Sequence, residues 1–273
     1  MFLILAAAAI AAASPAPPPI ARPPVSAANA DPAIFAVHDA DTTVYIFGTF
    51  HALDSKTQWF NDQVKDAFER SDELVLETLI PEGPPKPLAL GAAPVPLRIP
   101  MATSASFLAT TRMAIKAGRA QGMQVANGAD MVLRRIAERE GKTVEGLESL
   151  QFQLDMFNHL PQPAAAPPPR PGEAVASTAP MTSLSKSMAE MQSAWKRGDQ
   201  SVFVRMLGQI ERSSPETYQM MFVDRNVRFA EWIAARMQQP GVVFVAIGAG
   251  HLAGRDSVLV RLAERGIESQ RVN

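Results

Sequence analysis

The chain has 273 residues, 47% of them hydrophobic, so it is long enough to bury a sizeable core in one or two domains. Its formal net charge of −1 at pH 7 provides no overall field that would recruit nucleic acid or an anionic lipid surface. It has no cysteine, which excludes disulfides, a thiol nucleophile and cysteine-ligated metal sites.

The first residues form an apolar run, MFLILAAAAIAAA, which a proline-rich stretch over residues 14–24 follows directly. The run is too short to span a bilayer as a helix, but it has the length of a signal-peptide core. We therefore predict a signal peptide and leader over residues 1–30, a periplasmic or secreted protein, and no transmembrane segment in the mature chain. The alternative is a buried N-terminal helix, although the prolines would separate such a helix from the fold.

From residue 31 onward, short apolar runs alternate with segments of helical periodicity, as in an α/β domain. Strands are predicted at 34–37, 42–47, 73–79, 123–126, 142–148, 242–247 and 267–272, the first two forming a hairpin. Helices are predicted at 57–70, 103–118, 130–140, 150–159, 182–197, 199–211, 215–238 and 255–265. Two proline-rich segments, 81–100 and 161–180, have no periodicity and are predicted to be inserts within a single domain over residues 31–273.

Two of these strands lead into the same motif, Gly-x-x-His. Gly48–His51 follows the run VYIF, and Gly248–His251 follows VVFVAI. The glycines allow the chain to turn sharply off a strand end. Since ligands collect at the carboxyl ends of parallel strands, the two histidines are expected to share one site. The alternative is that each histidine only caps its own loop.

Two glutamates also lie at or near strand ends. Glu77 lies near the end of the predicted strand 73–79, and Glu148 ends the strand 142–148. Burying a carboxylate without a partner is costly, so each of them needs one. They could serve a site shared with the histidines, or they could form a structural ion pair, with Arg225 as a candidate partner.

Two imidazoles with one or two carboxylates are a suitable ligand set for a divalent Zn, Mn, Co or Fe ion with open positions. Such an ion lowers the pKa of bound water, and a remaining carboxylate could act as a general base in hydrolysis. His38 and His159 are predicted to be solvated or capping groups, and Met188, Met191, Met220 and Met221 to be adaptable core. The sequence has no Gly-x-Ser-x-Gly elbow, P-loop or Rossmann fingerprint.

Through these motifs the sequence resembles the TraB/GumN family, whose relatives include the pheromone-shutdown protein PrgY and the Tiki metalloproteases. Gly48–His51 and Gly248–His251 match the two Gly-x-x-His motifs of that family, and Glu77 matches its early glutamate. The other matches are Gly146–Ser149, followed by Gln151 or Gln153, and the pair Arg225-Asn226. The resemblance covers residues 33–273. It implies a mainly parallel central sheet flanked by helices, as in erythromycin esterase and ChaN-like proteins, and a metal-dependent hydrolase, specifically a peptidase.

Our interpretation is an exported hydrolase whose metal is held by His51 and His251 together with Glu77 or Glu148. The remaining carboxylate would activate water, while Arg225 and Asn226 would steady the substrate or an oxyanion. The substrate would be a peptide or a small molecule. The rival hypothesis is a non-catalytic periplasmic protein that captures haem, a metal or a peptide. The helical region 182–238 would form a cap over the site or the surface of a homodimer.

Overall fold

The computed structural model describes residues 30–79, 116–161 and 179–273. The predicted leader, the insert at 81–100, nearly all of the insert at 161–180 and most of the predicted helix 103–118 lie outside the described residues. No helix in the three described ranges is long and apolar enough to cross a membrane.

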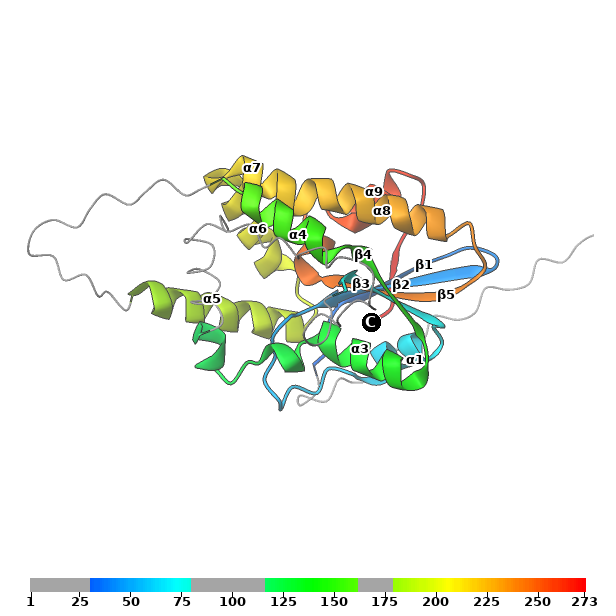
Figure 1. Cartoon of the computed structure of the whole chain (residues 1–273), viewed down its shortest axis with the longest axis horizontal. Helices are drawn as coiled ribbons and strands as arrows, with labels where there is room; N and C mark the ends of the chain where they lie inside the picture. Colours follow the sequence, from blue (N-terminus) through cyan, green and yellow to red (C-terminus); the bar gives the residue numbers. More distant parts are fainter. Residues whose placement is uncertain (1–29, 80–115, 162–178) are drawn as a thin grey trace, which may run out of the picture.

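A six-stranded mixed sheet forms the centre of the molecule (Figure 1). Its strands are β1 (Ile34–His38), β2 (Thr42–Thr49), β3 (Glu73–Thr78), β4 (Thr143–Glu148), β5 (Gly241–Gly248) and β6 (Gln270–Arg271). They lie in the order β4-β3-β5-β2-β1-β6. Strands β4, β3, β5 and β2 run parallel to one another. Strand β1 forms an antiparallel hairpin with β2 on one side and pairs antiparallel with β6 on the other. The predicted, mainly parallel α/β sheet is therefore confirmed.

The register brings the carboxyl ends of the four parallel strands to one edge. Thr49 of β2 pairs with Gly248 of β5, and Thr78 of β3 pairs with Glu148 of β4. Both Gly-x-x-His motifs and both strand-end glutamates therefore lie at the same edge of the sheet.

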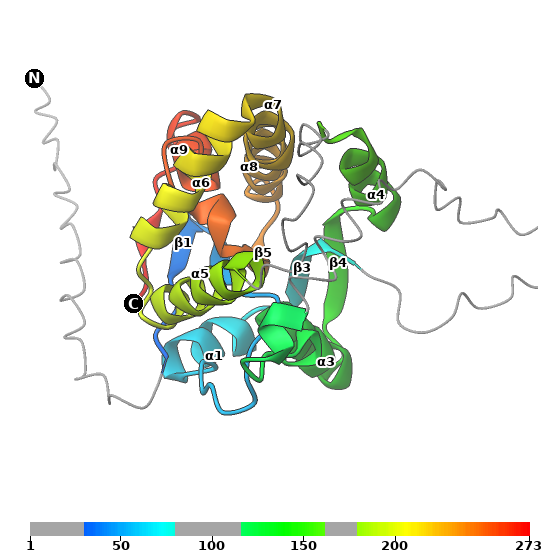
Figure 2. The same ribbon diagram turned by 90° about the vertical axis from the view of Figure 1, so that its left-hand side faces the viewer.

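The helices are α1 (Asp62–Glu69), α3 (Ala129–Glu140), α4 (Leu150–His159), α5 (Ala179–Lys196), α6 (Ser201–Ser213), α7 (Pro215–Tyr218), α8 (Asp224–Arg236) and α9 (Val258–Ala263). Helices α1 and α3 lie on one side of the sheet, and α8 and α9 on the other (Figure 1). The alternation of side chains along β5 explains the two layers. Phe244 and Ala246 pack into the core below α1 and α3, and Val243, Val245 and Ile247 pack against α8 and α9. Helices α4 to α7 extend past the carboxyl ends of the strands (Figures 1 and 2).

Several predicted ends follow directly from local capping. Ser149 accepts a hydrogen bond from the Phe152 N–H at the start of α4, and Gly141 ends α3 in the left-handed region with φ of 71°. The helix predicted over 57–70 begins only at Asp62, because Asn61 caps it by accepting from the Val64 N–H. In the preceding loop, Asp54 accepts hydrogen bonds from the Lys56 N–H and the Thr57 hydroxyl.

Three other predictions require correction. The strand expected over 123–126 is wrong, since Gln124 makes one isolated bridge to Leu53 and a 3₁₀ turn follows over Val125–Asn127. The final strand is only Gln270–Arg271, because only these two residues pair with β1. The helix expected over 215–238 is divided by a π-helical turn, Gln219–Val223.

Candidate active site at the carboxyl edge of the sheet

The two Gly-x-x-His loops pack directly against each other. His51 lies two residues past β2, and His251 lies in the 3₁₀ turn Ala249–Leu252 that follows β5. A Cβ on Gly48 would lie 3.2 Å from Leu252 Cδ1 and 3.3 Å from Ala249 Cα, so this close approach requires glycine. The absence of a side chain at the first motif glycine therefore lets the second motif loop pack closely against it.

Gly248 marks the point at which the candidate side chains converge. A Cβ at this position would lie 3.2 Å from Glu77 Oε2, 3.3 Å from His51 Nε2 and 3.6 Å from His251 Cδ2. The structure therefore brings the two histidines and one glutamate together at one edge of the sheet, as predicted.

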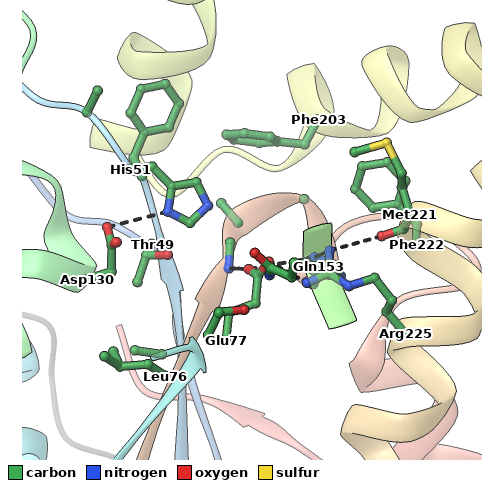
Figure 3. A pocket seen from close by; sticks show the side chains of 18 of the residues that line it. Thr49, His51, Leu76, Glu77, Asp130, Gln153, Phe203, Met221, Phe222 and Arg225 are labelled. Carbon is green, nitrogen blue, oxygen red and sulfur yellow. Dashed lines mark hydrogen bonds and ion pairs between the residues drawn. The ribbon is translucent and has the colours of Figure 1, made fainter. Parts of the chain in front are cut away.

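Glu77 projects from β3 into this cluster (Figure 3). Its Oε2 accepts the Gly248 N–H at 2.9 Å, and its Oε1 accepts from Arg225 Nη2 at 2.6 Å and from Gln153 Nε2 at 3.4 Å. Burial would raise the pKa of Glu77, but positive charge facing it, at His251 when protonated and at Arg225, together with the Gly248 N–H, holds that pKa well below its usual range. Glu77 is therefore an ionised carboxylate across the physiological range.

Arg225 of α8 joins the ends of two strands. Its Nη2 donates to Glu77 Oε1 at 2.6 Å and to Glu148 Oε2 at 2.7 Å, and its Nε lies 3.0 and 3.1 Å from the two oxygens of Glu148. Arg228 donates to Glu148 Oε1 at 3.0 Å. Burial lowers the pKa of Arg225, but the two carboxylates outweigh this effect and raise it. Both glutamates are thus paired with Arg225, and both oxygens of Glu148 are engaged.

His251 is buried, with 4% of its surface exposed, and its two nitrogens have different partners. Nδ1 lies 2.6 Å from Asn226 Oδ1, while Asn226 Nδ2 donates to the backbone oxygen of Asp256 at 2.7 Å. Because the amide oxygen only accepts, Nδ1 carries the proton and Nε2 keeps its lone pair. Nε2 lies 3.4 Å from Arg225 Nη1 and 3.7 Å from Glu77 Oε2. Burial lowers the pKa of His251 to about 4, with Glu77 opposing and Arg225 adding to the shift, so the ring is neutral at pH 7.

His51 is held by a residue that the sequence analysis did not single out. Its Nδ1 lies 3.4 Å from Asp130 Oδ1, in the first turn of α3, and 59% of its side chain is exposed. The loss of hydration lowers the pKa of His51, but the facing carboxylate of Asp130 and the charge of Glu77 raise it to about 9.

The Asp130 contact depends on how α3 docks against the first motif loop. The Ala129 N–H donates to the Phe50 oxygen at 3.0 Å, and a Cβ on Gly128 would lie 2.3 Å from the His51 oxygen. A glycine two residues before the predicted helix 130–140 was the available signal, and it did not identify the partner loop.

A cavity of about 540 Å³ opens over these groups. Its floor includes His51, Glu77, Arg225 and His251, whereas Glu148 and Asn226 are not among the lining residues. Its walls are apolar and come from α4, α5, α6 and the π turn: Phe157, Met188, Phe203, Met206, Met221 and Phe222. Met191 packs against the core as predicted, but Met188 and Met221 line the cavity. His38 and His159 are exposed, and His159 Nδ1 lies 2.6 Å from the Asp155 oxygen, in agreement with their predicted roles.

The donor atoms around Gly248 are chemically suited to a divalent transition metal, since two imidazoles and one carboxylate face the same small space. Glu148 does not fit as a ligand, because it does not line the cavity and its oxygens face Arg225 and Arg228. As the side chains stand in the described residues, no three His, Asp or Glu groups are arranged to hold a metal ion.

In a comparison with protein families, the TraB/PrgY/gumN family matches residues 33–90 and 89–271. Comparisons with curated proteins and with solved structures give no match. The matched ranges contain the converging histidines, both glutamates and the Arg225-Asn226 pair. The chain therefore belongs to the TraB/PrgY/gumN family.

Proposed function

We propose that the protein is an exported, metal-dependent hydrolase that cleaves peptide or ester bonds. The observation that carries this proposal is the convergence of His51 Nε2, Glu77 Oε2 and the His251 ring on Gly248, at the floor of a cavity. Few structural roles require two imidazoles and a carboxylate to face the same opening.

His51, His251 and Glu77 would hold a divalent Zn, Mn, Co or Fe ion. When bound, such an ion lowers the pKa of water and polarises a carbonyl group. His251 and Glu77 are the buried and fixed part of this set, with Nε2 and Oε2 3.7 Å apart. His51 is the exposed part, so its ring is the one we expect to move when the site is loaded.

The surrounding residues would prepare these groups for binding and catalysis. Asn226 keeps the proton of His251 on Nδ1, so Nε2 keeps its lone pair, and a bound ion would replace its contact with Arg225 Nη1 at 3.4 Å. Arg225 keeps Glu77 ionised, so Glu77 serves as a ligand or acceptor and would be a weak general base. Glu148 anchors Arg225 and does not enter the site. In hydrolysis the water oxygen bonds to the carbonyl carbon, the C–N or C–O bond breaks, and one water proton ends on the leaving group.

Elemental analysis of protein purified without chelator tests this proposal. Wild type should carry close to one transition metal per chain, and both His51→Ala and His251→Ala should lose it. His38→Ala is the matched control, because His38 is exposed and ends β1 beside the start of β2, away from the site. Peptide and ester substrates would then be screened after metal reconstitution. Absence of metal under every loading condition, with no metal-stimulated hydrolysis, would contradict the proposal.

The apolar walls of the cavity favour a second candidate, a binding protein that captures a peptide, haem or a metal without turnover. The two candidates differ in one result. Saturable binding with no product after prolonged incubation of the metal-loaded protein would favour capture.

We also propose that residues 1–30 direct export to the periplasm or beyond, on the basis of the apolar run Met1–Ala13 and the prolines that follow it. N-terminal sequencing of the protein recovered from an outer compartment should show that the apolar run has been removed. Recovery of the intact N-terminus from the cytoplasm would contradict this proposal.

A further inference from the structure

We infer that the substrate carries a large, uncharged apolar group, an aliphatic chain or an aromatic ring, which the helical walls of the cavity bind beside the reactive carbonyl. The placement of the carbonyl at His51, Glu77 and His251 rests on the proposed function. The binding of the apolar group rests on the cavity itself and is tested separately.

The apolar wall lies directly against the second Gly-x-x-His loop. A Cβ on Gly250 would lie 3.3 Å from Phe222 Cε1 and 3.9 Å from Met206 Cε. The rings of Phe222 and His251 have centroids 5.4 Å apart. An apolar group bound against this wall would therefore be next to the candidate reactive groups.

The π turn joins this wall to the polar floor. Met221 and Phe222 lie within the turn Gln219–Val223 and face the cavity, while Arg225 follows two residues later and reaches the strand ends (Figure 3). Met221 also accepts a hydrogen bond from Arg225 Nη1 through its backbone oxygen at 3.3 Å. Single π turns within α-helices are rare, and those that occur often lie at functional sites. The same short segment thus supplies an apolar wall and the residue that orders the carboxylates.

The floor offers little to an anionic group. Arg225 already contacts both Glu77 and Glu148, and the His51 ring faces Asp130 at 3.4 Å, so an anion would have to compete with these carboxylates. Affinity should therefore come mainly from apolar surface. Methionine adapts its shape to a ligand, so the Met-rich wall should select by size and hydrophobicity and less by exact outline.

A chain-length series tests this inference without requiring turnover. The probes are N-acylglycinamides with acyl chains from two to twelve carbons, which are neutral, measured by calorimetric titration of the full chain as purified. We expect affinity to increase about fourfold per methylene until the cavity is filled. The partly buried variants Met206→Gln and Met221→Gln should weaken binding of the long chains about tenfold and leave the shortest chain unchanged.

Val204→Thr is the matched control, since Val204 lies on α6 beside Phe203 but is 45% exposed and does not line the cavity. Its affinity series should coincide with that of wild type, and thermal unfolding would check that all variants fold. Affinity that does not change with chain length, or an equal loss in the control, would overturn the inference. If the protein hydrolyses substrates with metal but its affinity does not change with acyl chain length, only the apolar inference is overturned. If affinity increases with acyl chain length but the protein neither binds metal nor hydrolyses substrates, only the proposed function is overturned.

Discussion

Asn226 Oδ1 lies 2.6 Å from His251 Nδ1, and both residues are buried. The amide nitrogen of Asn226 is bound to the Asp256 oxygen, so the amide cannot turn over without losing that hydrogen bond. The tautomer of the second motif histidine is therefore fixed from helix α8.

Asn226→Ala should weaken metal binding about 10- to 100-fold, because Nδ1 loses the acceptor that fixes the ring. Competition with a chromophoric chelator measures this affinity. Asn61→Ala is a control for lost stability, since it removes the cap of α1 and should cost about 1 kcal/mol without changing metal affinity. Equal affinities of the Asn226 variant and wild type would show that Asn226 has no orienting role.

Asp130→Asn should lower the pKa of His51. In the metal-free wild type the ring should titrate near 9, because Asp130 faces Nδ1 and Glu77 adds negative charge. Removing the Asp130 charge should move this titration toward the ordinary value of 6.5. Proton NMR of the histidine ring resonances measures both curves, with exposed His38 as the internal reference. An unchanged His51 curve would show that Asp130 does not control the ring.

Arg225→Leu should destabilise the fold by about 3 to 5 kcal/mol, because it leaves two carboxylates at the strand ends without their shared partner. Urea unfolding monitored by circular dichroism measures this loss. Arg228→Ala removes a second contact to the same Glu148, but the Arg228 side chain is 43% exposed, so its loss should cost less than about 1 kcal/mol. Similar costs for the two variants would refute the role of Arg225 as the central clamp.

Protonation of Asp54 should make the protein less stable in acid. Burial raises its pKa, but hydrogen bonds from Thr57, Lys196 and the Lys56 N–H lower it from 3.8 to about 2. Because the folded pKa is the lower one, this stabilisation is complete above about pH 4 and is lost as the pH falls toward 2. Asp54→Asn should cost about 1 to 2 kcal/mol at pH 7 and flatten the pH dependence of unfolding between pH 4 and 2. An unchanged slope in this window would contradict the assignment.

The strand-end site could be predicted because its signals are local. Each Gly-x-x-His follows its own apolar run, and parallel strands in register bring Thr49 and Gly248 side by side. Glu77 and Glu148 were equivalent in the sequence, since both lie at or near strand ends. The cavity lining separates them, since Glu77 faces the cavity and Glu148 does not, although Arg225, beyond a π turn that has no recognisable sequence signal, contacts both.

The remaining features depend on contacts between distant segments. Asp130 meets His51 only because α3 docks on the loop after β2, through the Ala129 N–H and the Phe50 oxygen. Met188 and Met221 have the composition of core residues, and their position in the cavity wall is set by how α5 and the π turn pack. Periodicity describes each helix separately and does not encode such contacts.

The position of β5 also restricts when the molecule can fold. β5 pairs with β2 on one side and β3 on the other, although it comes from residues 241–248 of a chain of 273. Until it emerges from the ribosome, the sheet consists of two halves without a shared strand, and neither half can complete the cluster around Gly248. Pairings of such high sequence separation form late and slowly. Because both of its partners precede it in the chain, β5 is the strand that joins the two halves of the sheet.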